Sequence, residues 1–109
     1  MAKNEDRHRH FKCRRGLLSK GMSYDKQGLI YFTCKGYFTI LSKEEKERFK
    51  RLCFEVVNED EDRYSVLFNY LVGEETVEDL VADTDIPART MYYYIDKFYL
   101  NFNYVRIAV

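Results

Sequence analysis

Five side chains in the last quarter of the chain carry charge or hydrogen-bonding groups suited to nucleic acid. The guanidinium of Arg89 can donate to a guanine or a phosphate, and the ammonium of Lys97 can pair with a phosphate. Tyr93 can contact a phosphate or a thymine methyl group, while Thr90 and Tyr92 add hydroxyl groups. We therefore expect this stretch to contact double-stranded DNA.

Residues 76–98 contain these side chains and are predicted to form two amphipathic helices joined by a turn of three or four residues. Thr76 is the expected N-cap of the first helix. Pro87 suits the start of the second helix, where its missing N–H costs nothing. In the second helix, large apolar residues recur at steps of three and four and predict one buried face: Met91, Tyr94, Ile95, Phe98 and Phe102.

This segment resembles the DNA-binding helix-turn-helix of sigma-factor and regulator type. The resemblance covers 23 of the 109 residues. Ile86 would be the buried turn residue, Pro87 would take the capping place, and residues 90–92 would match the start of the recognition helix. The segment departs from the motif at Asp85, where glycine is common, and at Pro87, where serine or threonine is usual. The resemblance implies that the second helix contacts DNA.

The net charge of zero is the sum of two halves of opposite sign. Residues 1–53 contain 14 Lys or Arg and 6 Asp or Glu, a net of +8, whereas residues 54–109 contain 4 and 12, a net of −8. A basic end attracts phosphates through counterion release. Residues 1–16 are interpreted as a basic arm that lies along DNA or is simply solvated, with Arg14 and Arg15 as its candidate contacts.

The acidic half leaves a second interpretation open. A small protein-binding inhibitor of anti-CRISPR type could use an acidic belt and tyrosines to occupy the groove of a basic nucleic-acid-binding host protein. Tyr92, Tyr93, Tyr94 and Tyr99 are its candidate anchors, although Tyr94 and Tyr99 are expected to be mostly core. Its candidate acidic contacts are Glu59, Asp60, Glu61, Asp62, Glu74, Glu75, Glu78 and Asp79. Both interpretations fit a phage or mobile-element protein, and either is compatible with a homodimer.

The predicted architecture is one α+β domain. Strand-forming residues at 29–34 and a turn pattern at 24–28 predict an N-terminal hairpin. Ser42 and Glu45 form a predicted capping box, and Gly73 is expected to be a left-handed C-cap. The segments in order are the arm 1–16, a hairpin and extended connector 17–41, a bracing helix 42–58, a helix-turn-helix unit 63–102 and a terminal strand 103–109.

Several function classes are not expected from the sequence. The chain has no glycine-rich phosphate loop, nucleophile motif or metal-spaced ligand set, so we expect no enzyme, cofactor or metal. It has no apolar run near the roughly 20 residues of a membrane span, and its N-terminus does not read as a signal peptide. Three widely spaced cysteines suit a reduced, cytoplasmic protein.

Overall fold

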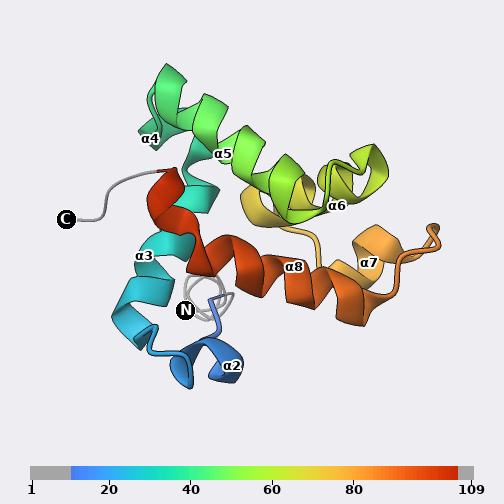
Figure 1. The fold of residues 1–109 in the computed structure, drawn as a ribbon, viewed down its shortest axis with the longest axis horizontal. Helices are drawn as coiled ribbons and strands as arrows, with labels where there is room; N and C mark the ends of the chain where they lie inside the picture. Colours follow the sequence, from blue (N-terminus) through green and yellow to red (C-terminus); the bar gives the residue numbers. More distant parts are fainter. Residues whose placement is uncertain (1–10, 106–109) are drawn as a thin grey trace, which may run out of the picture.

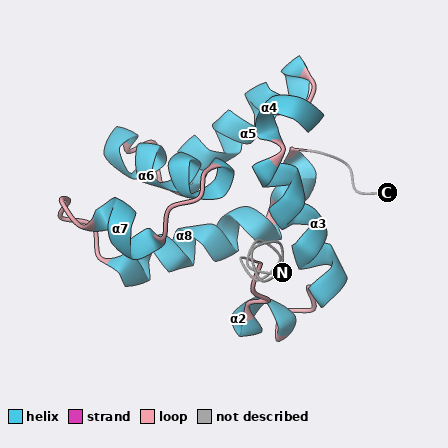
Figure 2. Cartoon of the chain, turned by 180° about the vertical axis from the view of Figure 1, so that it is seen from behind, coloured by secondary structure: helices cyan, strands magenta, loops and turns pink. Residues whose placement is uncertain are grey.

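The computed structural model describes residues 11–105, and every regular element in that range is helical (Figures 1 and 2). In chain order the elements are α2 (Arg15–Leu18), α3 (Tyr24–Lys35), α4 (Tyr37–Ile40), α5 (Lys43–Val56), α6 (Glu61–Val72), α7 (Val77–Val81), α8 (Ala88–Leu100) and the 3-10 helix η1 (Phe102–Tyr104). The predicted α+β class is therefore wrong, because residues 11–105 contain no strand. The described fold is all-helical.

The predicted hairpin is replaced by α3. Ser23 caps this helix by accepting a hydrogen bond of 3.1 Å from the Lys26 N–H, so the expected turn is instead a helix start. Gln27, Ile30 and Cys34 are all buried, and their spacing places them on one helical face. The β-branched and aromatic residues at 29–34 favoured a strand locally. The structure is instead a helix, in which side chains at three- and four-residue steps are buried. The expected extended connector after it is the short helix α4.

The predicted terminal strand also differs from the structure where the structure describes it. Residues 102–104 form η1, and the buried Val105 accepts a 3.0 Å hydrogen bond at its carbonyl oxygen from Nε of Arg48 on α5. Residues 106–109 of that strand lie outside the described residues. So do residues 1–10 of the predicted arm.

The predicted bracing helix has the expected start and buried face. Ser42 accepts from the Glu45 N–H at 3.1 Å, and Glu45 accepts from the Ser42 N–H at 2.8 Å, which confirms the capping box. The inward side chains of α5 and its C-cap are buried, as predicted: Phe49, Leu52, Cys53, Val56 and Val57.

Helix α8 is central to the described fold, because it packs against α2, α5, α6, α7 and η1 (Figure 1). Its start at Ala88, after Pro87 in the N-cap, agrees with the expected capping place of that proline. Four residues of the predicted buried face are confirmed on α8, with exposures between 0% and 5%: Met91, Tyr94, Ile95 and Phe98. Phe102 is also buried, but it lies in η1, beyond the end of α8 at Leu100.

Helices α6, α7 and α8 pack against one another. Thr76 caps α7 by accepting from the Asp79 N–H at 3.1 Å, as predicted, and Ile86 is buried in the turn, only 8% exposed. The turn covers residues 82–87, longer than expected, because α7 ends at Val81 in a turn in which Thr84 bonds back to the Val81 carbonyl. The helix-turn-helix identity of this unit stays a prediction.

Gly73 does not adopt the predicted left-handed C-cap. Its φ of −104° and ψ of −162° are extended, so positive φ is not what requires glycine here. A Cβ atom at this position would lie 2.6 Å from the carbonyl oxygen of Asn69. Close approach to the last turn of α6 therefore requires glycine at this position.

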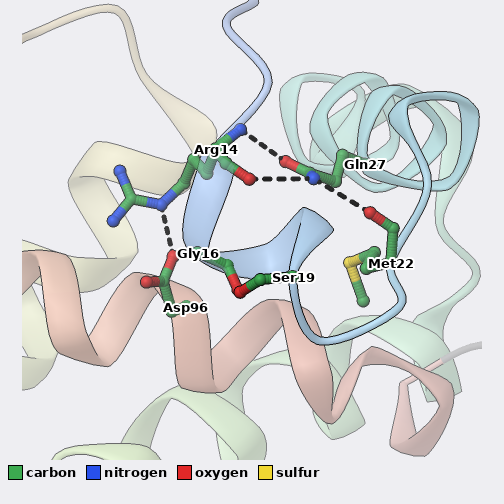
Figure 3. Close-up of polar contacts among 6 residues, drawn as sticks. All are labelled: Arg14, Gly16, Ser19, Met22, Gln27 and Asp96. Atoms are coloured by element: carbon green, nitrogen blue, oxygen red, sulfur yellow. Dashed lines mark hydrogen bonds and ion pairs between the residues drawn. The ribbon is translucent and has the colours of Figure 1, made fainter.

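The side chain of Gln27 joins α3 to the segment that leads into α2 (Figure 3). This side chain is 0% exposed. Its Oε1 accepts from the Arg14 N–H at 2.8 Å, and its Nε2 donates to the carbonyl oxygens of Arg14 at 3.2 Å and Met22 at 3.1 Å. Because buried amides cost free energy unless they are hydrogen-bonded, these bonds define where the segment around Arg14 lies.

We predict that Gln27→Met lowers the free energy of unfolding by about 1–3 kcal/mol, since it keeps the shape but leaves backbone groups of Arg14 and Met22 without their partner. Urea unfolding followed by circular dichroism measures this change. Leu29→Met on the same helix is the control, because Leu29 is 46% exposed and its replacement should have little effect. Equal stability of the two variants would contradict the role given to Gln27.

Candidate nucleic-acid interface

The outward face of α8 carries Arg89, Tyr93 and Lys97 at four-residue intervals. Residues spaced in this way form one stripe along a helix, here opposite the buried face of α8. Arg89 is exposed, Tyr93 is 60% exposed, and Nζ of Lys97 lies 5.8 Å from the centroid of the Tyr93 ring. We call Arg89, Tyr93 and Lys97 the outer stripe. Thr90 is of intermediate exposure and borders it.

The one acidic residue of α8, Asp96, is paired with Arg14 from the segment before α2 (Figure 3). Nε of Arg14 donates to Oδ1 of Asp96, and this hydrogen bond raises the pKa of Arg14 further. The Arg14 guanidinium carbon also lies 5.2 Å from the centroid of the Tyr92 ring. The charge of Asp96 is thus compensated within the protein by Arg14.

The two predicted arm residues therefore lie in different settings. Arg14 is half-buried and its Nε is engaged with Asp96, whereas Arg15 is exposed on α2. Helix α2 packs against α8, and a Cβ atom on Gly16 would lie 3.7 Å from Oδ2 of Asp96. Arg15 lines a depression together with Tyr92, Ile95 and Tyr99 of α8.

The predicted acidic belt is divided over several depressions rather than forming one surface. Glu59 and Glu61 line a depression between α5 and α6 that also contains Lys50 and Arg51. Glu74, Glu75 and Glu78 line another depression, where Glu78 accepts a 2.8 Å hydrogen bond from the Tyr92 hydroxyl. Asp79 is exposed in the first turn of α7.

The remaining acids of the belt gather near the start of α8. Asp60 and Asp62, from the start of α6, line a depression of about 610 Å³ together with Asp83 and Asp85 of the α7–α8 turn. We call this the acidic depression. The sequence prediction did not include Asp83 and Asp85, although their place directly before the second helix was a signal that they would lie beside its N-terminus.

Two of the four candidate tyrosine anchors belong to the core, as expected. Tyr94 is 5% exposed and accepts a 2.6 Å hydrogen bond at its hydroxyl from Nη1 of Arg63, and Tyr99 is 6% exposed. Tyr93 presents most of its ring to solvent, and Tyr92 is intermediate. An interface on this face can therefore use Tyr93 and the edge of Tyr92.

Two half-buried phenols are predicted to destabilise the fold at alkaline pH. Burial raises the pKa of Tyr31 to about 12, with Glu74 adding to the shift. Burial also raises the pKa of Tyr92 to about 12, with its hydrogen bond to Glu78 adding. The folded chain therefore holds more protons than the unfolded chain between pH 10 and 12, so stability is complete below pH 10 and falls as pH rises through that window.

Tyrosinate absorbance of the folded chain, compared among wild type, Tyr31→Phe and Tyr92→Phe, measures these two ionisations. Urea unfolding below pH 10 and near pH 12 measures the change in stability. Titration of both groups near the ordinary value of 10 in the folded chain would contradict the prediction.

Residues 11–105 contain neither a metal-ligand cluster nor a helix suited to a membrane. Within residues 11–105, no three His, Cys, Asp or Glu side chains are grouped so that they could hold a metal ion. None of the helices in that range has both the length and the apolar character that crossing a bilayer requires.

Comparisons of the chain with protein-family models, with curated proteins and with solved structures found no match.

Proposed function

We propose that the chain binds double-stranded DNA and that α8 enters the major groove. The observation that carries this proposal is the outer stripe of α8, in which Arg89 is exposed and Lys97 is of intermediate exposure, while Asp96, the acid beside them, is paired with Arg14. A guanidinium reads guanine through two parallel hydrogen bonds, and an ammonium serves as a phosphate contact. Arg89 is therefore assigned to a base and Lys97 to the backbone.

The position of Arg89 suits this assignment. It is the second residue of α8, and recognition helices contact base edges with their N-terminal residues. The opposite face of α8 is buried against α5 and α6, so the stripe is presented by a helix held in the core. The backbone that carries these side chains therefore needs no further ordering when it binds, which lowers the entropic cost of association.

Further phosphate contacts would come from the segment beside α8. Lys12 and Arg15 are both exposed there, and α2 packs directly on α8. Contacts on either side of a groove fix the orientation of the protein without reading sequence. A regulatory protein of phage or mobile-element type, acting on DNA in the cytoplasm, is the role proposed for this interface.

Arg89→Ala is expected to weaken binding to its preferred duplex by about 1–3 kcal/mol, because one base contact is lost. Fluorescence anisotropy across a salt titration measures both affinity and the number of phosphates engaged, since the logarithm of affinity falls linearly with the logarithm of salt concentration. Lys50→Ala is the control, because it removes one exposed charge from α5. Circular dichroism should show both variants folded. Unchanged affinity of Arg89→Ala at matched salt would reject the assignment.

The acidic depression favours a second candidate function. Asp60, Asp62, Asp83 and Asp85 surround one concave surface beside the start of α8, with Arg63 as its only cation among the described lining residues. A basic groove of a nucleic-acid-binding protein would find complementary charge there. In this alternative the chain is an inhibitor that binds such a protein in place of DNA, and Tyr93 is an exposed anchor.

One double substitution separates the two functions. Asp83→Asn with Asp85→Asn removes two negative charges beside the N-terminus of α8, so we predict tighter DNA binding if α8 approaches phosphates. If the chain binds a basic protein instead, the same variant should bind purified nucleic-acid-binding enzymes more weakly. Glu47→Gln with Glu55→Gln on α5 is the matched control, since both residues are exposed. DNA affinity unchanged relative to this control would contradict the prediction for DNA.

A further inference from the structure

Two adjoining depressions form a groove lined by tyrosines. They share Lys12, Tyr31, Tyr70 and Tyr92, and the larger of the two, about 450 Å³, is also lined by Tyr99. We call these five residues and the space between them the tyrosine groove. Its walls come from α3, α6, α8 and the segment before α2. A space of this size lies in the range of about 300–1,000 Å³ found for small-molecule sites.

The Tyr99 hydroxyl is the feature that points to a ligand. Tyr99 is 6% exposed, yet no residue within 11–105 forms a hydrogen bond with its hydroxyl. Tyr94, which is buried to the same extent, has Arg63 as a partner. A polar group in such a place is nearly always paired with protein, water or a ligand, so the hydroxyl of Tyr99 can form a hydrogen bond with a molecule that enters the groove.

Tyr99 itself lines the larger depression of the groove. Burial raises the pKa of Tyr99, nearby Cys34, Tyr70 and Tyr31 raise it further, and Arg14 lowers it. Tyr31, Tyr70 and Arg14 all line the same depression as Tyr99. The phenol therefore stays protonated at neutral pH and can donate a hydrogen bond.

The charges around the groove indicate which ligand it can accept. Lys12, Arg14 and Arg15 line the depression that contains Tyr99. Glu75 and Glu78 line only the adjoining one. Neutral phenols and cations are both donors, so the end near Tyr99 is complementary to an oxyanion. Tyrosine rings along the wall favour a planar group beside that anion.

We infer that the tyrosine groove binds a small planar molecule bearing a carboxylate or phosphate, with its oxyanion at Tyr99, Lys12 and Arg15. The ring of the ligand packs against Tyr31 and Tyr70. None of the outer-stripe residues lines this groove, although Lys12 and Arg15 belong both to the groove and to the proposed DNA interface. The inference does not depend on the binding of DNA.

Thermal unfolding of the full chain with benzoate, phenyl phosphate or uncharged benzyl alcohol tests the site. A ligand that binds only the folded chain raises Tm in a concentration-dependent way. We expect a saturable rise with benzoate or phenyl phosphate, and the larger of the two rises identifies the preferred oxyanion. Benzyl alcohol should leave Tm unchanged. No rise with either anion would overturn the inference.

Tyr99→Phe provides the decisive variant, because it removes a hydroxyl that has no partner within residues 11–105 and should not lower Tm without ligand. It should abolish the rise caused by the anion. Tyr93→Phe on the outer stripe is the matched control and should keep the full rise. A rise retained in Tyr99→Phe would place the anion elsewhere and overturn the inference. If Tyr99→Phe proves unstable, Lys12→Gln at the exposed end should reduce the rise, and a full rise there would count equally against the site.

Discussion

Burial of one face of α8 is the constraint on which the rest of the structure depends. Met91, Ile95 and Phe98 are each at most 1% exposed, and burying a side chain of this size contributes about 1.5–3 kcal/mol. The ring centroids of Phe98 and of Phe49 on α5 are 5.0 Å apart, in an edge-to-face arrangement. Since α8 also packs against α2, α6, α7 and η1, rotation of this helix would disturb nearly every other contact, and the orientation of the outer stripe follows from the core.

Lys35 joins the N-terminal helices to the α6–α8 unit. Its Nζ donates to the carbonyl oxygens of Tyr70, at 3.3 Å, and Gly73, which lie at the end of α6 where carbonyls lack partners within the helix. The same ammonium lies 5.1 Å from the centroid of the Tyr31 ring and 5.8 Å from that of Tyr70. Burial lowers the pKa of Lys35, and the nearby charge of Glu74 opposes that shift. The last residue of α3 thereby fixes the loop that leads into α7.

The helices that could be predicted from the sequence are those that bury apolar side chains on only one face. The α5 capping box and the buried face of α8 were readable because polar and apolar residues alternate there at helical spacing. Helix α3 was not, since it also exposes Leu29 and Phe32, 46% and 51%, so its apolar residues do not mark one side. Its defining residue is the buried Gln27, and a glutamine carries no sequence signal of burial.

The candidate site was predictable only in part, for a similar reason. Arg89, Tyr93 and Lys97 follow from helical periodicity once α8 is recognised. The pairing of Arg14 with Asp96 joins residues 82 positions apart, and no local pattern specifies it. The pairing depends on a second contact. Gln27 holds the backbone of Arg14, and this places the Arg14 side chain over α8.

Whether a chain of zero net charge can approach DNA at the outer stripe depends on how far its acidic side chains lie from that stripe. Charges are screened over about 8 Å at physiological ionic strength, whereas the described part of the molecule extends at least 30 Å in every direction. Acids farther than about 8 Å from the outer stripe therefore contribute little there. Asp83 and Asp85 directly precede the start of α8 and do act there. In the proposed interface, the balance between these two acids and Arg89, rather than the total charge of the chain, would determine which surface α8 accepts.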